Sequence, residues 1–267
     1  MLHKIFRASN KVWNAMYYDE LLDTDDFQIS YLKEADRLYF NAAHALASAS
    51  SEILDTIEFY FKQRSMQPGV YLDPANPTAL EETLLQRGYS LAEEEEENWY
   101  VLERNKASLE DFETKIKEFQ IKNQSLECIV FVPTLPSILL DQFLELNGYV
   151  NSISTPALQK LKDNLLNSKD PKIQFICIIA RENEKAISTG LIGLYNNMAF
   201  LAEGATHPKF RQRGIYSWLS RIATLYAIKQ NCNLIAVNCY KTAFSNHTFR
   251  RLGFSLICTR VFYTKSN

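Results

Sequence analysis

The segment 199–227 holds the residues whose types and spacing point most directly to chemistry. It reads AFLAEGATHPKFRQRGIYSWLSRIATLYA, so a strand pattern ends at Pro208 and a basic turn precedes an amphipathic helix pattern. The first amides of a helix have no acceptor within the helix, and the helix dipole adds partial positive charge there. Arg211 and Arg213 add full charges, and Gly214 lets the backbone approach an anion closely. This pattern is typical of a pyrophosphate site, although a basic helix start without a ligand stays an alternative.

A second pattern lies nearer the carboxyl terminus. SNHTFRRLGF at 245–254 predicts a short helix that ends at Gly253 and leads directly into a strand. The segment FRRLGFSL at 249–256 also aligns with LLQRGYSL at 84–91, glycine on glycine and aromatic on aromatic. We interpret this echo as a sign of two related domains, and two unrelated helix ends are the alternative.

Together these segments resemble the GNAT acetyltransferases. Motif A of that family is commonly written Arg/Gln-x-x-Gly-x-Gly/Ala, and here it is occupied by Arg211, Gln212, Arg213, Gly214, Ile215 and Tyr216. Tyr216 departs from the small final residue of the family. SNHTFRRLGF is similar to the helix-to-strand segment before the family's last strand. The resemblance covers 126–267, and the first hundred residues resemble the degenerate amino-terminal domain of tandem GNAT proteins, without motif A.

The resemblance implies an acyl-CoA-dependent N-acyltransferase. Its donor would be acetyl-CoA, with CoA as product and no metal, and its acceptor a primary amine on a small molecule, peptide or protein. The pyrophosphate would lie on the motif, and the pantetheine arm would pair with main-chain groups of the preceding strand. The residues expected to contact the donor are Ala205, Thr206, His207, Arg211, Gln212, Arg213, Gly214, Ile215, Tyr216, Asn246 and Phe249.

The resemblance also implies catalytic roles. Glu203 is the expected general base, acting directly or through water, while an outward-facing strand glutamate is the alternative. A main-chain amide beside it would stabilise the developing oxyanion. Many family members carry a tyrosine acid where Phe249 stands, so Tyr240 or Tyr216 is the candidate replacement. Because of Phe249, an acyl-CoA-binding regulatory module with weak or no catalysis is a second hypothesis, and transfer of aminoacyl or other long acyl groups is a third.

Periodicity gives the elements that must position these residues. Strands are expected at 69–72, 99–102, 125–132, 173–180, 186–195, 198–206, 234–239 and 254–263, with another leading through Tyr89. Helices are expected at 2–18, 49–64, 78–87, 106–124, 138–146, 156–166, 210–229 and 245–252. The acidic run 93–97 is expected to be a solvated surface segment.

These elements predict an α/β fold of the α+β mixed-sheet kind. Two GNAT-like domains are expected, each a central mixed, mostly antiparallel sheet flanked by helices. We place a degenerate domain at 1–105, a connecting helix at 106–125 and the acetyl-CoA-binding catalytic domain at 126–267.

Overall composition and charge argue against several classes of binding partner. The chain has 267 residues, enough for two domains, and a net charge of −2 without a long basic stretch, so no nucleic-acid partner is expected. No apolar run approaches the roughly 20 residues of a membrane helix, so no membrane partner is expected. The five cysteines have no CxxC spacing, which disfavours a disulfide framework or a zinc site. We expect a cytoplasmic protein that is a monomer or a homodimer.

Overall fold

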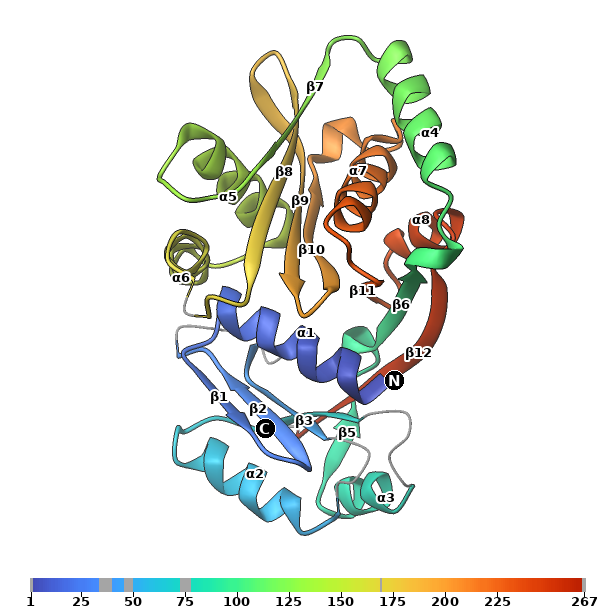
Figure 1. Ribbon diagram of the computed structural model, residues 1–267. Coiled ribbons are helices and arrows are strands. Elements are labelled where there is room, and N and C mark those ends of the chain that lie inside the picture. Colours follow the sequence, from blue (N-terminus) through green and yellow to red (C-terminus); the bar gives the residue numbers. More distant parts are fainter. Residues whose placement is uncertain (1, 34–39, 46–49, 73–77, 169, 266–267) are drawn as a thin grey trace. The chain divides into compact units, whose positions relative to one another are not determined.

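The structure is a computed structural model that describes residues 2–33, 40–45, 50–72, 78–168 and 170–265 (Figure 1). The chain divides into two compact units that are not continuous in sequence. The first unit contains 1–100, 238–247 and 256–267, and the second contains 101–237 and 248–255. The sequence-based division into 1–105, 106–125 and 126–267 follows chain order instead. It stays a prediction about the evolutionary domains and about which of them binds the donor.

The first unit contains a mixed sheet with strand order β1-β2-β3-β4-β12. Its strands are β1 (Glu20–Asp23), β2 (Phe27–Tyr31), β3 (Ala42–Ala45), β4 (Gly69–Leu72), β5 (Tyr89–Leu91) and most of β12 (Ser255–Lys265), with β6 (Glu97–Glu103) beginning here. Its long helices are α1 (Leu2–Met16), α2 (Ile53–Lys62) and α3 (Thr78–Gln86). β3 and β4 are parallel, whereas β12 is antiparallel to both β4 and β5.

The two faces of this sheet differ in chemistry because side chains alternate along each strand. One face carries Phe27, Ile29, Ala43, Ala45, Val70 and Leu72, which form an apolar core with α2 and α3. The other face carries Gln28, His44 and Tyr71 as a cross-strand row, and all three side chains are buried. Helix α1 packs on β2, and Figure 1 shows α1 and α2 on opposite sides of β1–β3.

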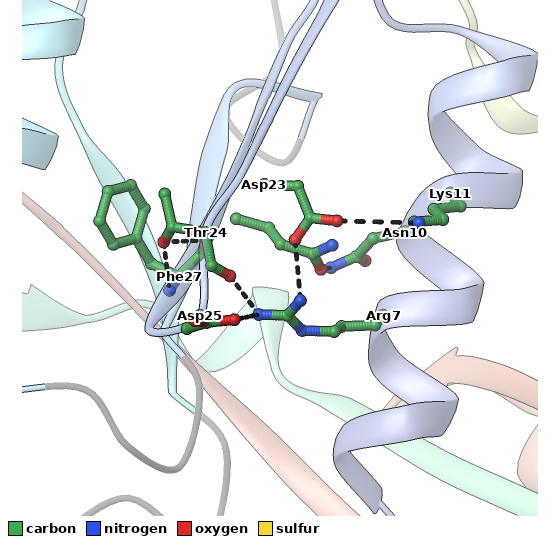
Figure 2. Close-up of polar contacts among 8 residues, drawn as sticks. Arg7, Asn10, Lys11, Asp23, Thr24, Asp25 and Phe27 are labelled. Carbon is green, nitrogen blue, oxygen red and sulfur yellow. Dashed lines mark hydrogen bonds and ion pairs between the residues drawn. The ribbon is translucent and has the colours of Figure 1, made fainter.

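Helix α1 is tied to the β1–β2 hairpin by charged side chains (Figure 2). Arg7 lies 3.3 Å from Asp23 and 3.9 Å from Asp25, and it also donates a hydrogen bond to the Thr24 carbonyl. Lys11 lies 3.9 Å from Asp23. These contacts fix the helix over the polar face of the sheet.

The second unit contains a sheet with strand order β11-β10-β9-β8-β7. Its strands are β7 (Leu126–Phe131), β8 (Gln174–Glu182), β9 (Lys185–Tyr195), β10 (Met198–Thr206) and β11 (Leu234–Tyr240), the last as far as Val237. Its helices are α4 (Leu109–Lys122), α5 (Ile138–Asn151), α6 (Thr155–Leu166), α7 (Ile215–Lys229) and part of α8 (Ser245–Arg251). β10 is parallel to β11, and the other pairs are antiparallel. Helices α5 and α7 pack on β9 and β10 from opposite sides (Figure 1).

The predicted fold class is confirmed, since mixed sheets are flanked by helices as the periodicity indicated. Local capping explains several helix starts: Ser108 and Ser137 accept hydrogen bonds from the third residue of α4 and α5. In the ranges that the structure describes, no helix has both the length and the apolar composition needed to cross a bilayer.

Helices α5 and α7 depart furthest, at one end each, from their predicted bounds. Helix α5 runs on to Asn151 because Gly148 is a helix-contact residue and not a cap; a Cβ there would lie 2.4 Å from Leu158 Cδ1. Buried Asn147 also bonds within the fold, from Nδ2 to the Phe143 carbonyl and the Thr189 hydroxyl. Helix α7 starts at Ile215, later than predicted, because the preceding turn contains left-handed residues.

Two expectations for the first hundred residues were wrong. Strands β1, β2 and β3 were not predicted, because they have four or five residues each and lack a clear apolar alternation: β1 is mostly exposed, whereas β2 and β3 carry buried polar side chains. The acidic run 93–97 is solvated only in part. Glu96 is 6% exposed and lies 2.5 Å from the Lys241 ammonium group, and Glu97 begins strand β6.

Candidate functional site

Strand β10 changes its register at Glu203. Ala202 pairs with Leu191 and Ala205 with Thr189, so two residues of β10 oppose the single Gly190 of β9. This is a β-bulge, and Glu203 adopts a left-handed conformation there with φ +49°. A left-handed conformation costs a residue other than glycine about 1–2 kcal/mol, and such conformations gather at functional sites.

Beyond the bulge, the main-chain polar groups of β10 point alternately toward β9 and away from it. The His207 amide donates to the Ile187 carbonyl at 2.9 Å, and the buried Ser188 hydroxyl donates to the Ala205 carbonyl at 2.8 Å. Main-chain groups alternate along a strand, so those of Thr206 point away from β9. Pairing with β11 covers only 198–201 in the described residues, and β10 continues to Thr206. The end of β10 therefore presents a main-chain edge beyond its last β11 pair.

The basic turn 211–214 follows β10 after a short 3-10 turn, Pro208–Phe210, and contains two left-handed residues. Gln212 and Gly214 are both left-handed, with φ +63° and +77°, and Gly214 is the N-cap residue of α7. The first intrahelical bond runs from the Trp218 amide to the Gly214 carbonyl, so the helix amides before it have no acceptor within α7. The 15-residue helix α7 thus begins next to Gly214 with backbone N–H donors that the helix itself does not use. Any other residue at position 214 would be strained in the left-handed conformation.

The two arginines of the turn are held in different ways. Arg211 is exposed, and its Nε donates to the Thr206 carbonyl at 3.2 Å. Arg213 lies 3.0 Å from Glu182, and this hydrogen bond holds the pKa of Glu182 below its ordinary value. Arg213 therefore has an acidic partner within the unit, and Arg211 is the arginine whose charge is less compensated.

Tyr216, the departure from the motif, lies over the bulge. A Cβ added to Gly204 would lie 2.6 Å from Tyr216 Cε2 and 2.7 Å from its hydroxyl. The Tyr216 ring meets Phe249 edge to face at 6.2 Å between centroids, and Phe249 meets Phe254 at 5.3 Å. Phe249 is 1% exposed. Tyr216, the large residue at the end of the motif, therefore fits here because Gly204 has no side chain.

This fit predicts coupling between Gly204 and Tyr216. Gly204→Ala is expected to destabilise the chain by about 1 kcal/mol, the lower end for overpacking, because the new methyl group displaces the outer end of the partly exposed Tyr216 ring. Tyr216→Ala in the same chain removes the clash, so the two changes together should cost less than the sum of the single changes. Urea unfolding of the two single variants and the double variant measures this coupling. Additive free energies would contradict the packing of Tyr216 on Gly204.

His207 faces a separate hollow of the second unit. Its ring stacks on Tyr149 at 5.5 Å, and its Nδ1 accepts from the Lys209 amide at 3.3 Å. The hollow has a volume of about 470 Å³ and is lined by residues of α5 and the start of β9 as well as His207. Glu145 and Lys185 give it charges of both signs.

Two further sequence-predicted residues, Asn246 and Tyr240, lie in the first unit. Asn246 is 7% exposed: its Oδ1 accepts from Asn98, and its Nδ2 donates to the carbonyls of Tyr240, Lys241 and Ala243. Its amide is thus committed to the fold at both ends, which supports a structural role. Tyr240 ends β11 and is 37% exposed.

Several residues at this site were not found from the sequence. Glu182, Ser188 and Tyr149 approach the motif only through the pairing of β8 with β9 and the packing of α5. No local spacing links them to 206–216. Glu203 and Gly204, in contrast, are visible in the sequence, but their bulge depends on the register with β9.

The overall fold has clear relatives among solved structures. The structure of a GCN5-related N-acetyltransferase from Kribbella flavida matches with a TM-score of 0.69 and 14% identity, covering 99% of this chain and 95% of that one. A tandem GNAT protein from the clavulanic acid biosynthesis pathway matches with a TM-score of 0.63 and 9% identity, over 89% of this chain and 77% of that one. A GCN5-related N-acetyltransferase from Sphaerobacter thermophilus matches with a TM-score of 0.62 and 12% identity, over 91% and 82%.

By sequence, no protein-family profile and no curated protein matches the chain. The structural likeness extends over nearly the whole chain at low identity, so it establishes the fold. The chain has the fold of the GNAT superfamily, as the motif resemblance predicted.

Proposed function

We propose that the protein is an acyl-CoA-dependent N-acyltransferase that transfers acetyl from acetyl-CoA to a primary amine. The observation that carries this proposal is the continuity of two features on one strand. Strand β10 has a bulge at Glu203 and a main-chain edge at its end, and the basic turn with left-handed Gly214 follows after one 3-10 turn and leads into α7. A pyrophosphate fits the turn, and an extended amide-bearing chain such as pantetheine fits the strand edge.

In this proposal the donor supplies an activated acyl group, and the protein supplies binding and proton transfer. Arg211 and the first amides of α7 bind the diphosphate, while Arg213 is oriented by Glu182. The main-chain amides after the bulge stabilise the negative charge that develops on the acyl oxygen. Glu203 at the bulge takes the proton from the incoming amine. The Tyr216 hydroxyl, which lies against Gly204, replaces the missing hydroxyl of Phe249 as the acid toward the leaving thiolate.

A second function is favoured by one observation. Phe249 is buried between Tyr216 and Phe254 and carries no hydroxyl, so this packing suits a module that binds acyl-CoA without turnover. Such a module would keep the turn and the strand edge and lack the acid.

One experiment separates these functions. Acetyl-CoA should raise the melting temperature of the full chain, because a ligand specific for the native state stabilises it. A panel of primary amines should then give steady release of free CoA thiol. Absence of the thermal shift would contradict the donor site. A thermal shift without thiol release on any amine would favour the binding module.

A further inference from the structure

The polar face of the first unit's sheet contains a small hollow beneath α1. Its volume is about 70 Å³, room for roughly five water-sized positions. Four aromatic rings, those of Trp13, Tyr18, Tyr71 and Trp99, line it together with Arg260 and Glu97. Two of its lining residues, Trp13 and Glu97, are partly exposed.

Arg260 is the charged group at the buried end. Its side chain is 1% exposed, and its guanidinium lies over the rings of Phe6, Tyr71 and Trp99 at 4.6, 5.0 and 5.9 Å. Its Nη2 donates to His44 Nδ1 at 3.1 Å, but its Nε has no acceptor in the described residues. A buried guanidinium is normally paired with an anion, because an uncompensated buried charge is costly.

His44 does not supply that anion. Burial, and then the positive charge of Arg260, hold the pKa of His44 well below its ordinary value, so its ring is neutral. The imidazole Nε2 lies 3.5 Å from the Ser30 hydroxyl, which leaves Nδ1 as acceptor for Arg260. Tyr71 adds a buried hydroxyl that also has no partner in the described residues.

Glu97 is the opposite charge of the hollow. Its two carboxylate oxygens accept from Asn238 Nδ2 at 3.0 Å and Trp99 Nε1 at 3.1 Å. Burial raises the pKa of Glu97, and the charge of Arg260 acts against that rise. Within the described part of the chain, no ion pair of 4.0 Å or less joins Arg260 to Glu97. Two opposite charges therefore face one hollow without neutralising each other by contact.

Helix α1, which lines the hollow, is held to the sheet and to the β1–β2 hairpin by polar contacts. Asn10 of α1 donates from Nδ2 to Gln28 Oε1 at 2.7 Å, and the ion pairs of Arg7 and Lys11 hold the same helix to the hairpin (Figure 2). Gln28 is completely buried, and its Nε2 has no acceptor in the described residues. Such a set of buried, incompletely paired polar groups is uncommon in a folded protein, and each of these groups needs a partner.

We propose that this hollow binds the zwitterionic head of a free amino acid, with its carboxylate on Arg260 and its ammonium group on Glu97. The five non-hydrogen atoms of such a head match the volume, both charges are compensated, and the aromatic rings favour the ammonium group. The side chain of the amino acid extends past Trp13, the partly exposed aromatic residue of the lining. The inference concerns binding within the first unit and stands independently of the proposed acyl transfer.

The test uses the full chain without any acyl donor. The standard L-amino acids are titrated by calorimetry and by tryptophan fluorescence, since Trp13 and Trp99 line the hollow. We expect one or more of them to bind. The N-acetyl form and the methyl ester of the bound amino acid, which each lack one charge, should bind at least about tenfold more weakly.

Variants assign each charge to its residue. Glu97→Gln should weaken binding of the amino acid at least about tenfold and remove its advantage over the N-acetyl form. Arg260→Lys should weaken binding and reduce the advantage over the methyl ester, because lysine loses the fork geometry of arginine. Glu94→Gln, the same change at an exposed position of the same segment, should leave the affinity unchanged.

Three outcomes would overturn the proposal. These are binding of no amino acid at millimolar concentration, equal binding of the free, acetylated and esterified forms, and an unchanged affinity in Glu97→Gln. If Arg260→Lys does not fold, the capped ligands and Glu97→Gln still decide. The proposed acyl transfer is unaffected by any of these outcomes, because it is tested by acetyl-CoA binding and thiol release.

Discussion

Gly214→Val is expected to lower the affinity for acetyl-CoA at least about a hundredfold, equivalent to about 2.7 kcal/mol or the loss of one or two charge-assisted hydrogen bonds. The backbone at Gly214 has φ +77°, which a β-branched residue adopts only with strain, and a Cβ there would lie 3.3 Å from Phe119 Cε2. In the proposed donor site, the valine side chain would also hinder the approach of the diphosphate to the first amides of α7. Calorimetric titration of the full chain with acetyl-CoA measures the loss.

Gly88→Val is the matched control for this change. Gly88 has φ +82°, is exposed and has nothing within 4 Å of an added Cβ. Both variants should therefore lose stability through backbone strain, whereas only Gly214→Val should lose the donor. Equal donor affinity in the two variants would place the site elsewhere.

Glu203→Gln is expected to lower the acetylation rate about 10²-fold or more, the usual range for loss of a general base. Donor affinity should barely change, because the carboxylate is proposed to act on the acceptor amine. Stability should also hold, because glutamine retains the same backbone and the same β-bulge geometry at φ +49°. Single-turnover acetylation of the preferred amine, measured across pH, gives both the rate and its pH dependence.

The pH profile distinguishes a base from a residue that only shapes the bulge. Activity of the natural chain should fall as the base becomes protonated at acidic pH, and in Glu203→Gln this limb should disappear or follow the amine itself. Glu184→Gln is the matched control, because Glu184 is another left-handed glutamate, with φ +64°, in the turn between β8 and β9. An undiminished rate in Glu203→Gln would assign the proton transfer to water or to another residue.

The basic, glycine-containing turn before α7 and the buried stripe of that helix could be predicted from the sequence because they are locally determined, although the helix was expected to start at Phe210 and starts at Ile215. Pro208 ends strand β10 at Thr206, Gly214 permits a left-handed N-cap, and apolar spacing specifies the buried stripe of α7. The glycine echo is also local: Gly88 and Gly253 are both left-handed, with φ +82° and +87°, at the ends of α3 and α8. Whether the echo records a duplication stays a prediction.

Only the tertiary structure decided the surroundings of these local features. The bulge at Glu203 depends on the register of β10 with β9, and the orientation of Arg213 depends on Glu182 from β8. These partners lie far from the turn in sequence, so no spacing rule predicts them.

The residues that line the polar hollow of the first unit are even harder to group from the sequence alone. A single arginine in LICTRVFY and the last glutamate of an acidic run carry no mark of a shared site. They face one hollow because β12 returns from the end of the chain to pair with β4, which places Arg260 on the face that also carries His44 and Tyr71. Local sequence specifies turns, caps and periodicity through neighbouring residues, whereas strand pairing between distant segments decides which side chains meet and which charges lose water.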